Sequence, residues 1–232
     1  MYGEDPEYYF REFLTHTSLQ PEQLASKRVL EVGFGHGRLL HQIQEWCPSA
    51  YGLDLAKPLR SAYLRPGSTF FGNLLSIPFV PGQFDLVVCR GVVHCTADPE
   101  ASFGCVAAQV ADHGMLYLAG IYEPGTRGML ILRKVLPRSW SYPESLLLGL
   151  TSVCSGLRSV LEGIRDRNMD PGFLRTYCDH HKLEIFDVMA PRWTSILGAD
   201  TIVPWFASQG FEARQVGPGS YVGIKVAAPV EA

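Results

Sequence analysis

A strand that turns through three alternating glycines into a helix is the feature that most constrains this chain. Residues 29–32 are apolar apart from one acid and β-branched at two positions, which is typical of a central parallel strand. Gly33, Gly35 and Gly37 follow, and apolar residues then recur at helical spacing. Glycines let backbone amides approach a ligand, and the N-terminus of the helix adds partial positive charge. The segment therefore predicts a cradle for a nucleotide ligand, whose anionic group can be a phosphate or a carboxylate.

Strand and helix patterns alternate along most of the chain, which predicts an α/β fold with a doubly wound parallel sheet. We expect one domain over residues 1–232, with an N-terminal helical cap at 1–26 and a helical insertion at 125–185 after the fifth strand. The expected strands are 28–33, 50–53, 69–72, 84–89, 115–121, 211–216 and 221–226, and the expected helices are 36–46, 57–63, 98–111 and 201–209.

Charge and cysteine usage argue against several functional classes. The net charge of −3 gives no sign of the basic face that nucleic-acid binders usually carry, so a nucleic-acid substrate is disfavoured. The six cysteines form no CxxC pair, which is typical of reduced thiols, and the first residues show no secretory pattern. The longest uncharged run, residues 145–157, is shorter than the roughly 20 residues that a transmembrane helix needs. We therefore expect a cytoplasmic protein without a transmembrane segment.

The spacing of the glycines argues against a dinucleotide. A dinucleotide-binding fingerprint has its third glycine at the sixth position of the motif, where this chain has Arg38. An acidic residue, Glu31, followed by a glycine at every second position resembles the first motif of class I S-adenosylmethionine (SAM) dependent methyltransferases. A nicotinamide-dependent oxidoreductase and an ordinary glycine-rich turn remain the alternatives.

Two later segments strengthen the resemblance to these methyltransferases. Asp54 ends the second expected strand, where a carboxylate can accept hydrogen bonds from both ribose hydroxyls, or can cap the next helix. Residues 71–79 resemble the family's GDxxxLPF segment, with Asn73 at the position of the acid that accepts the adenine amino proton. The resemblance implies that Asn73 binds the adenine edge and that Leu74 packs on its face, although an asparagine there also suits an ordinary turn.

The stretch 83–99 resembles the segment FDLVxxxGVLHHxxDP of the ubiquinone and menaquinone type of methyltransferase. We expect Asp85 to hold loop backbone at the start of its strand. Arg90 and Gly91 lie where that strand ends and are expected to line the methionine part of SAM. The resemblance places His94 near the transferred methyl group, as a general base or only as a wall of the pocket. Cys95 departs from the family's second histidine, so a mechanism with paired imidazoles is in doubt.

Three further segments resemble the same family more loosely. Residues 112–118 resemble its GG turn, with His113 in place of one glycine, while 186–193 and 203–211 resemble its F-D-x-x-x-P and W-F-x-x-x-G-F segments. The resemblance implies a Rossmann-like seven-stranded sheet whose last strand is antiparallel, with SAM as cofactor and S-adenosylhomocysteine as product. The implied cofactor-binding residues are Glu31, Gly33, Phe34, Gly35, Gly37, Asp54, Leu55, Asn73, Leu74, Arg90 and Gly91; the implied substrate-binding residues are Tyr9, His94, Tyr122 and Trp193.

The substrate is expected to be small and largely apolar. The insertion at 125–185 is rich in leucine, which suggests an apolar lid over the active site, or alternatively a membrane-surface or dimer contact. A secondary metabolite or a quinone-like acceptor, methylated on carbon or oxygen, fits a lid of this kind. The open alternatives are a non-transferring use of bound SAM in a rearrangement or elimination, and a methyltransferase-like subunit without catalysis. No metal is expected, because the adjacent His180 and His181 on a helix point to different faces.

Overall fold

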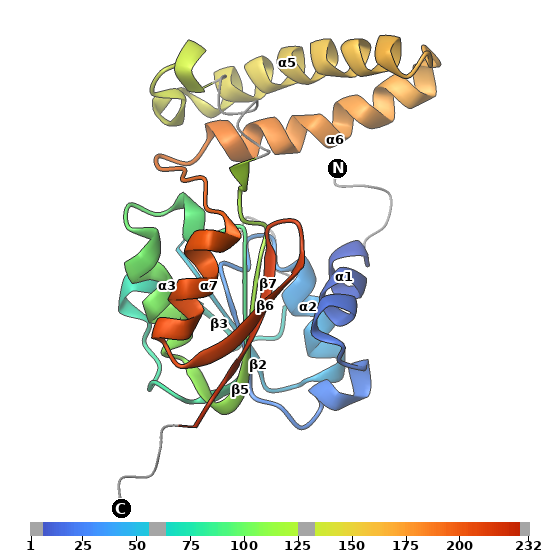
Figure 1. Ribbon diagram of the computed structural model, residues 1–232. Helices are drawn as coiled ribbons and strands as arrows, with labels where there is room; N and C mark the ends of the chain where they lie inside the picture. The colour runs from blue at the N-terminus through green and yellow to red at the C-terminus, as the bar shows by residue number, and fades with distance from the viewer. Residues whose placement is uncertain (1–6, 56–63, 125–132, 228–232) are drawn as a thin grey trace, which may run out of the picture. The chain divides into compact units, whose positions relative to one another are not determined.

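The computed structural model describes residues 7–55, 64–124 and 133–227, so the helix expected at 57–63 lies outside the described part. The chain divides into two compact units. The sheet unit comprises Glu7–Pro124 and Ser195–Ala232, and the helical unit comprises Gly125–Thr194 with Met1–Pro6. Figure 1 shows that the first contains the β-sheet and the second a pair of long helices.

The sheet has seven strands in the order β3-β2-β1-β4-β5-β7-β6. Strands β1 to β5 pair in parallel, whereas β7 is antiparallel to both β5 and β6. This confirms the expected doubly wound sheet of the class I methyltransferase type. The strands are β1 Val29–Val32, β2 Ala50–Asp54, β3 Thr69–Phe71, β4 Phe84–Arg90, β5 Val110–Ala119, β6 Phe211–Gly217 and β7 Ser220–Lys225.

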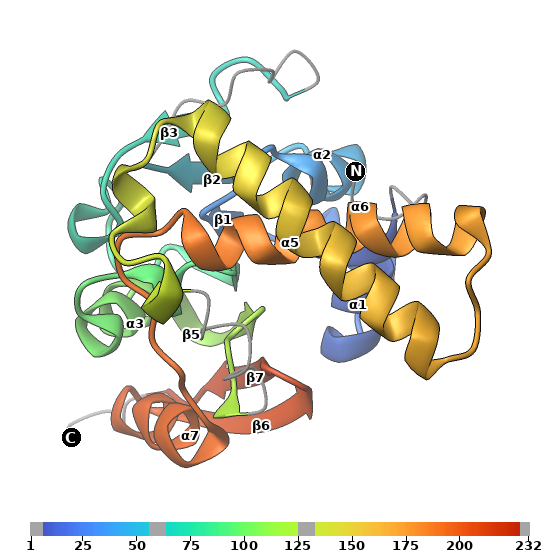
Figure 2. The same cartoon turned by 90° about the horizontal axis from the view of Figure 1, so that it is seen from above.

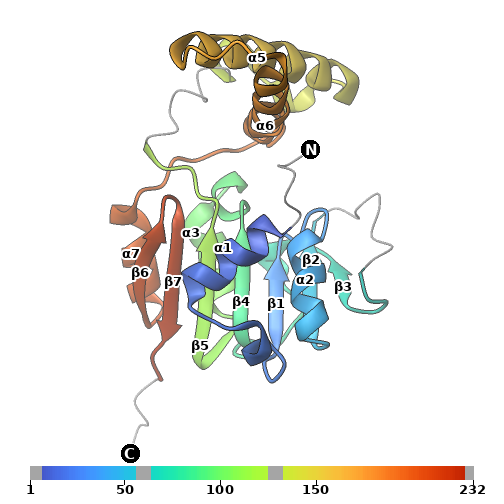
Figure 3. The same cartoon turned by 90° about the vertical axis from the view of Figure 1, so that its right-hand side faces the viewer.

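Helices cover both faces of this sheet. Figure 3 shows α1 (Tyr8–Thr17) and α2 (Arg38–Trp46) on one face, with α3 (Pro99–Ala107) and α7 (Ala199–Ser208) on the other. Side chains alternate between the faces because a strand has a period of two. Along β1, Leu30 and Val32 join the core beneath α3 and α7, whereas Val29 joins the core beneath α1 and α2. Three short 3₁₀ turns connect these elements: η1 Pro21–Leu24, η2 Leu74–Ser76 and η3 Val93–Cys95.

The boundary expected between the helix at 98–111 and the strand at 115–121 was wrong. Helix α3 ends at Ala107, and β5 begins at Val110, which pairs with Phe84 of β4. The register between these strands shifts near that point, and His113 adopts a positive φ of 61°. The irregular backbone lets the strand continue through the His113-Gly114 turn, whereas the sequence pattern predicted that the strand would begin after it.

The helical unit is built from α5 (Glu144–Arg165) and α6 (Pro171–Met189), which lie side by side (Figure 1 and Figure 2). A short turn, η5 (Ser139–Ser141), precedes them. The segment Ser145–Arg165 of α5 is long and apolar enough to cross a membrane by length and composition, a test that core helices of soluble proteins also pass. The uncharged run noted in the sequence ends before Arg158, but the helix continues for two more turns.

The chain leaves and re-enters the sheet unit at neighbouring points. The amide of Leu197 donates to the carbonyl of Tyr122 at 2.8 Å, just before the helical unit begins. The amide of Ser195 donates to the carbonyl of His94 at the same distance. Two backbone hydrogen bonds therefore anchor the returning chain to the sheet unit.

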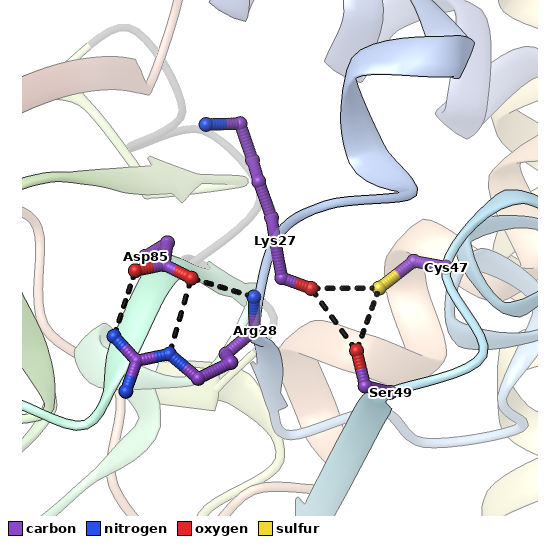
Figure 4. A network of polar contacts seen from close by, with 5 residues as sticks. All are labelled: Lys27, Arg28, Cys47, Ser49 and Asp85. Carbon is purple, nitrogen blue, oxygen red and sulfur yellow. Dashed lines mark hydrogen bonds and ion pairs between the residues drawn. The ribbon is translucent and has the colours of Figure 1, made fainter.

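A polar network joins β1, β4 and the end of α2 (Figure 4). Asp85 accepts hydrogen bonds from the backbone amide of Arg28 at 2.7 Å and from its guanidinium at 2.8 and 3.2 Å. The carbonyl of Lys27 accepts from Cys47 Sγ and Ser49 Oγ, both at 3.1 Å. The network holds the chain just before β1, and it confirms that Asp85 holds backbone at the start of its strand.

The guanidinium of Arg28 lowers the pKa of the Asp85 carboxyl through its hydrogen bonds. We expect Asp85→Asn to lower the free energy of unfolding by about 1 kcal/mol near neutral pH, a modest loss because solvent partly screens the pair. The stabilisation is present above the unfolded-state pKa and is lost as the pH falls through the lowered folded-state pKa. Urea unfolding at about pH 7 and about pH 3 should show the difference shrinking at the lower pH.

Asp166→Asn is the matched control for this comparison. Asp166 pairs with the adjacent Arg165 at 2.8 Å, whereas Asp85 also accepts the backbone amide of Arg28, 57 residues away. Replacement of Asp166 should therefore lower the free energy of unfolding by less than replacement of Asp85. If Asp85→Asn lowered the free energy of unfolding by the same amount at about pH 3 as at about pH 7, the stabilisation would not come from the ion pair with Arg28.

Candidate functional site

The glycine loop after β1 has three residues in the left-handed region, with φ of 78° at Gly33, 52° at Gly35 and 76° at Gly37. A Cβ atom on Gly33 would lie 2.0 Å from Val92 Cγ2, and one on Gly37 would lie 2.7 Å from Leu64 Cδ1. A Cβ on Gly35 would enter open space. Gly33 and Gly37 therefore allow close packing of the protein on itself, whereas Gly35 leaves room beside the loop for another molecule.

Asp54 connects the end of β2 to this loop. Its Oδ2 accepts a hydrogen bond from the backbone amide of Gly35 at 2.7 Å. The amide of Gly33 donates to the carbonyl of Leu53 at the same distance. The carboxylate expected to bind ribose is thus held beside the one loop residue that leaves open space.

Glu31 lies buried in β1, with 3% of its surface exposed. Its Oε2 has no hydrogen-bond partner among the described residues. Burial raises the pKa of Glu31 to about 8; Arg90 opposes this increase and Asp54 adds to it. An unpaired buried carboxyl oxygen is costly, so this position suits a ligand that offers a hydrogen-bond donor or a positive charge.

Arg90, at the end of β4, is held by helix α1. Its Nη1 lies 2.5 Å from Glu12 Oε2, and its guanidinium carbon lies 4.2 Å from the centre of the Tyr9 ring. Arg90 was expected to line the methionine part of the cofactor and Tyr9 to bind substrate, and the structure places the two side chains together. Glu12 was missed by the sequence analysis. Its position three residues after Tyr9, on the same face of a helix, is the signal that could have revealed it.

His94 lies in η3, just beyond Gly91. Its ring is buried, lies 4.3 Å from the ring of Tyr122 between centres, and carries an Nδ1 without a hydrogen-bond partner among the described residues. Burial lowers the pKa of His94 to about 4, so the imidazole is neutral at physiological pH. An efficient general base has a pKa near the working pH. The surroundings therefore favour a neutral hydrogen-bonding side chain.

The residues expected around adenine lie at the ends of β2 and β3. Asn73 caps η2, because its Oδ1 accepts from the amide of Leu75 at 3.0 Å. Leu74 packs against the main core and Leu55 is exposed. Phe34 is buried, with its ring centre 6.3 Å from that of Phe71. The roles of these residues in cofactor binding stay predictions.

Trp193 belongs to the helical unit, unlike the other expected site residues. Its ring is half exposed, and the guanidinium carbon of Arg192 lies 4.7 Å from the ring centre. Its role in substrate binding stays a prediction. Among the described residues, no group of three or more His, Cys, Asp or Glu side chains is arranged to hold a metal ion.

Comparison with known proteins agrees with this geometry. The family model of the methyltransferase domain matches residues 2–144, which include the glycine loop, Asp54 and His94. No curated protein sequence matches the chain significantly.

Several solved structures share the fold. An O-methyltransferase family protein from Burkholderia thailandensis has a TM-score of 0.52 and 16% identity, over 96% of this chain and 57% of its own. Human N-acetylserotonin methyltransferase, solved in complex with SAM, has a TM-score of 0.51 and 12% identity, over 96% and 54%. The YcgJ protein from Bacillus subtilis has a TM-score of 0.50 and 14% identity, over 95% and 100%. This chain thus spans little more than half of the first two proteins.

Replacement of Gly35 tests whether the open space beside the loop is the cofactor site. We expect Gly35→Ala to raise the dissociation constant for SAM by at least about tenfold, because the new methyl group would occupy that space. Gly82→Ala is the matched control, since Gly82 also has a positive φ, of 73°, and a Cβ atom there would meet no other atom within 4 Å. Both variants should lose about 1–2 kcal/mol of stability from backbone strain. Equal loss of SAM binding in both variants would contradict this assignment.

The raised pKa of Glu31 predicts an unusual pH dependence of stability. Its folded-state pKa of about 8 exceeds the unfolded value of 4.5, so stability should fall as the pH rises between them. The slope is at most about 1.4 kcal/mol per pH unit. Glu31→Gln should remove this decline, so that the variant gains on the wild-type protein between about pH 5 and about pH 8 in urea unfolding. If the free energies of unfolding of wild type and Glu31→Gln changed in parallel with pH, Glu31 would be ionised in the folded protein and the prediction would be wrong.

Proposed function

We propose that this protein, which belongs to the methyltransferase domain family, transfers the methyl group of SAM to a small, largely apolar organic acceptor. The observation that carries the proposal is the pairing of the Gly35 amide with Asp54 beside open space. Nearby, the buried Glu31 presents an oxygen that lacks a partner among the described residues. These groups suit a ligand with hydroxyl donors at one end and an ammonium group at the other.

The proposed cofactor contacts follow from the chemistry of these groups. The carboxylate of Asp54 accepts hydrogen bonds from the ribose hydroxyls. The positive charge of the methionine ammonium group lowers the raised pKa of Glu31, which then loses its proton and supplies negative charge toward that group. Asn73, at the end of β3, offers its side-chain amide to the adenine edge. Phe34, Leu55, Leu74 and Gly91 complete the proposed cofactor surface. When bound, SAM supplies an electron-poor methyl carbon attached to a sulfonium.

The proposed acceptor is neutral and largely apolar. The neutral, buried His94 beside Tyr122 can exchange a hydrogen bond with an acceptor hydroxyl without bringing charge into the site. Transfer is an in-line displacement, so the protein contributes mainly by orienting the acceptor and excluding water. A quinone-like or secondary-metabolite substrate, methylated on carbon or oxygen, suits such a site. Tyr9 and Trp193 remain proposed substrate contacts, and a cytoplasmic location is part of the same proposal.

Calorimetric titration with SAM and with S-adenosylhomocysteine tests the proposed cofactor. We expect Asp54→Ala to weaken both affinities by roughly 10-fold to 100-fold, because it removes charge-assisted hydrogen bonds to ribose and the anchor of Gly35. Asp112→Ala is the control, since Asp112 is exposed on β5. Absence of binding heat with either molecule, in protein that is folded by circular dichroism, would refute the proposal.

SAM labelled on its methyl group separates transfer from other uses of the cofactor. The protein is incubated with labelled SAM and a panel of phenols, quinols and polyketide-like acceptors. Label in an organic product supports methyl transfer. Product formation without label would instead indicate a rearrangement or an elimination, and cofactor binding without any turnover across the panel would favour a non-catalytic subunit.

A further inference from the structure

From Thr151 onward, helix α5 has its small residues inside and most of its large apolar residues outside. The buried positions recur every fourth residue: first Leu147, which packs with Ile185 and Met189 of α6, and then Thr151, Ser155, Ser159 and Gly163. The exposed large side chains of the same helix are Leu146, Leu148, Val153, Leu157, Val160, Leu161 and Ile164. A helix at the surface of a protein in water has the opposite arrangement, with its apolar stripe toward the core.

The buried face packs closely against α6, and the hydroxyl groups on it donate hydrogen bonds to backbone carbonyls of α5 itself. A Cβ on Gly163 would lie 2.8 Å from Leu174 Cδ2, so the helices approach where side chains are smallest. The hydroxyl of Ser159 donates to the carbonyl of Ser155 at 2.8 Å, and that of Thr151 donates to the carbonyl of Leu148 at 2.9 Å. Small residues between helices, with large apolar ones facing outward, are typical of helices in lipid. We refer to six of these exposed apolar residues as the outer face; Leu148, two residues after Leu146, lies on the other side of the helix and is not part of it.

The sequence of α6 decides between a helix that spans a membrane and one that lies on it. The two helices are joined by the short segment 166–170, in which every residue except Met169 is polar, so both would have to enter the bilayer together. Helix α6 contains Arg175, Asp179, Lys182, Glu184 and Asp187 within 19 residues. Five charges at the centre of a bilayer are prohibitive, whereas an interfacial position for α5 leaves α6 on the aqueous side.

The charge of the inserted segment indicates which surface it fits. Residues 125–194 contain ten Lys and Arg against seven Asp and Glu, although the whole chain has 20 against 23. The six N-terminal residues grouped with them add Glu4 and Asp5, so the helical unit as a whole has ten against nine. The inserted segment itself is thus basic within an acidic protein. An anionic lipid surface complements both its charge and its outer face. A second copy would instead bring two basic segments together.

We propose that α5 lies in the interface of an anionic membrane, with its outer face among the acyl chains and α6 toward the water. The proposal does not depend on the methyl-transfer reaction. It does place the enzyme where apolar acceptors concentrate.

Flotation of the full chain with vesicles tests this proposal. We expect the protein to bind vesicles of phosphatidylcholine and phosphatidylglycerol, at roughly seven to three, more strongly than pure phosphatidylcholine, and less at high salt. Leu157→Gln with Leu161→Gln should reduce the partition coefficient at least about tenfold, because two side chains that are 65% and 67% exposed no longer enter the lipid. Val80→Gln, at a residue 71% exposed in the sheet unit, is the matched control and should bind as wild type does.

Two further measurements test whether something other than lipid covers the outer face. Light scattering after size exclusion detects a second copy, and thermal unfolding detects coverage by another part of the same chain. A wild-type dimer that becomes a monomer in the double variant, without vesicle binding, would assign the face to a second copy. A lower unfolding temperature of the variant, without vesicle binding, would mean that the face is covered within the chain. Either result, or equal vesicle binding by wild type and double variant, overturns the proposal, while retained SAM binding in the variant keeps it separate from the proposed function.

Discussion

Five parallel strands end at one edge of the sheet, and the loop after β1 must turn there without burying unpaired amides. The amide of Gly33 reaches the carbonyl of Leu53, and the amide of Gly35 reaches the carboxylate of Asp54. The loop is thus shaped by the neighbouring strand. The two hydrogen bonds are accepted by consecutive residues of β2, Leu53 and Asp54. The register between β1 and β2 therefore determines where the Asp54 carboxylate lies relative to the loop. A shift by one residue would remove it from the loop.

The period of two in the central strands gathers charge on one face of the sheet. Glu31 shares the parity of Val29 in β1, and Arg90 shares that of Leu86 and Val88 in β4, so both point toward α1. Burial of a carboxyl group there raises its pKa, and the nearby guanidinium only partly offsets this cost. Glu31 is therefore mostly protonated in the protein alone near neutral pH, and a cationic ligand would favour its ionised form.

Sequence reasoning predicted the alternation of strands and helices, the glycine loop and the role of Asp85, because each rests on short-range patterns with few physical solutions. It misplaced the boundary between α3 and β5, since the register shift opposite Phe84 depends on a partner strand that is distant in sequence. It also missed Glu12, whose partner lies 78 residues away. For the insertion, the sequence indicated a leucine-rich helical segment, but not that the serine face of α5 would turn inward. That choice is made by the packing of α6.

The two backbone hydrogen bonds that anchor the returning chain, at Tyr122 and at His94, have an evolutionary consequence. The helical unit is inserted between two segments, one ending near Tyr122 and one beginning near Leu197, that are hydrogen-bonded to each other. Helices there can lengthen, shorten or be exchanged without altering the loop closure of the nucleotide-binding scaffold. Diversification of this hairpin among descendants of one ancestor can therefore proceed independently of the ancient ligand cradle.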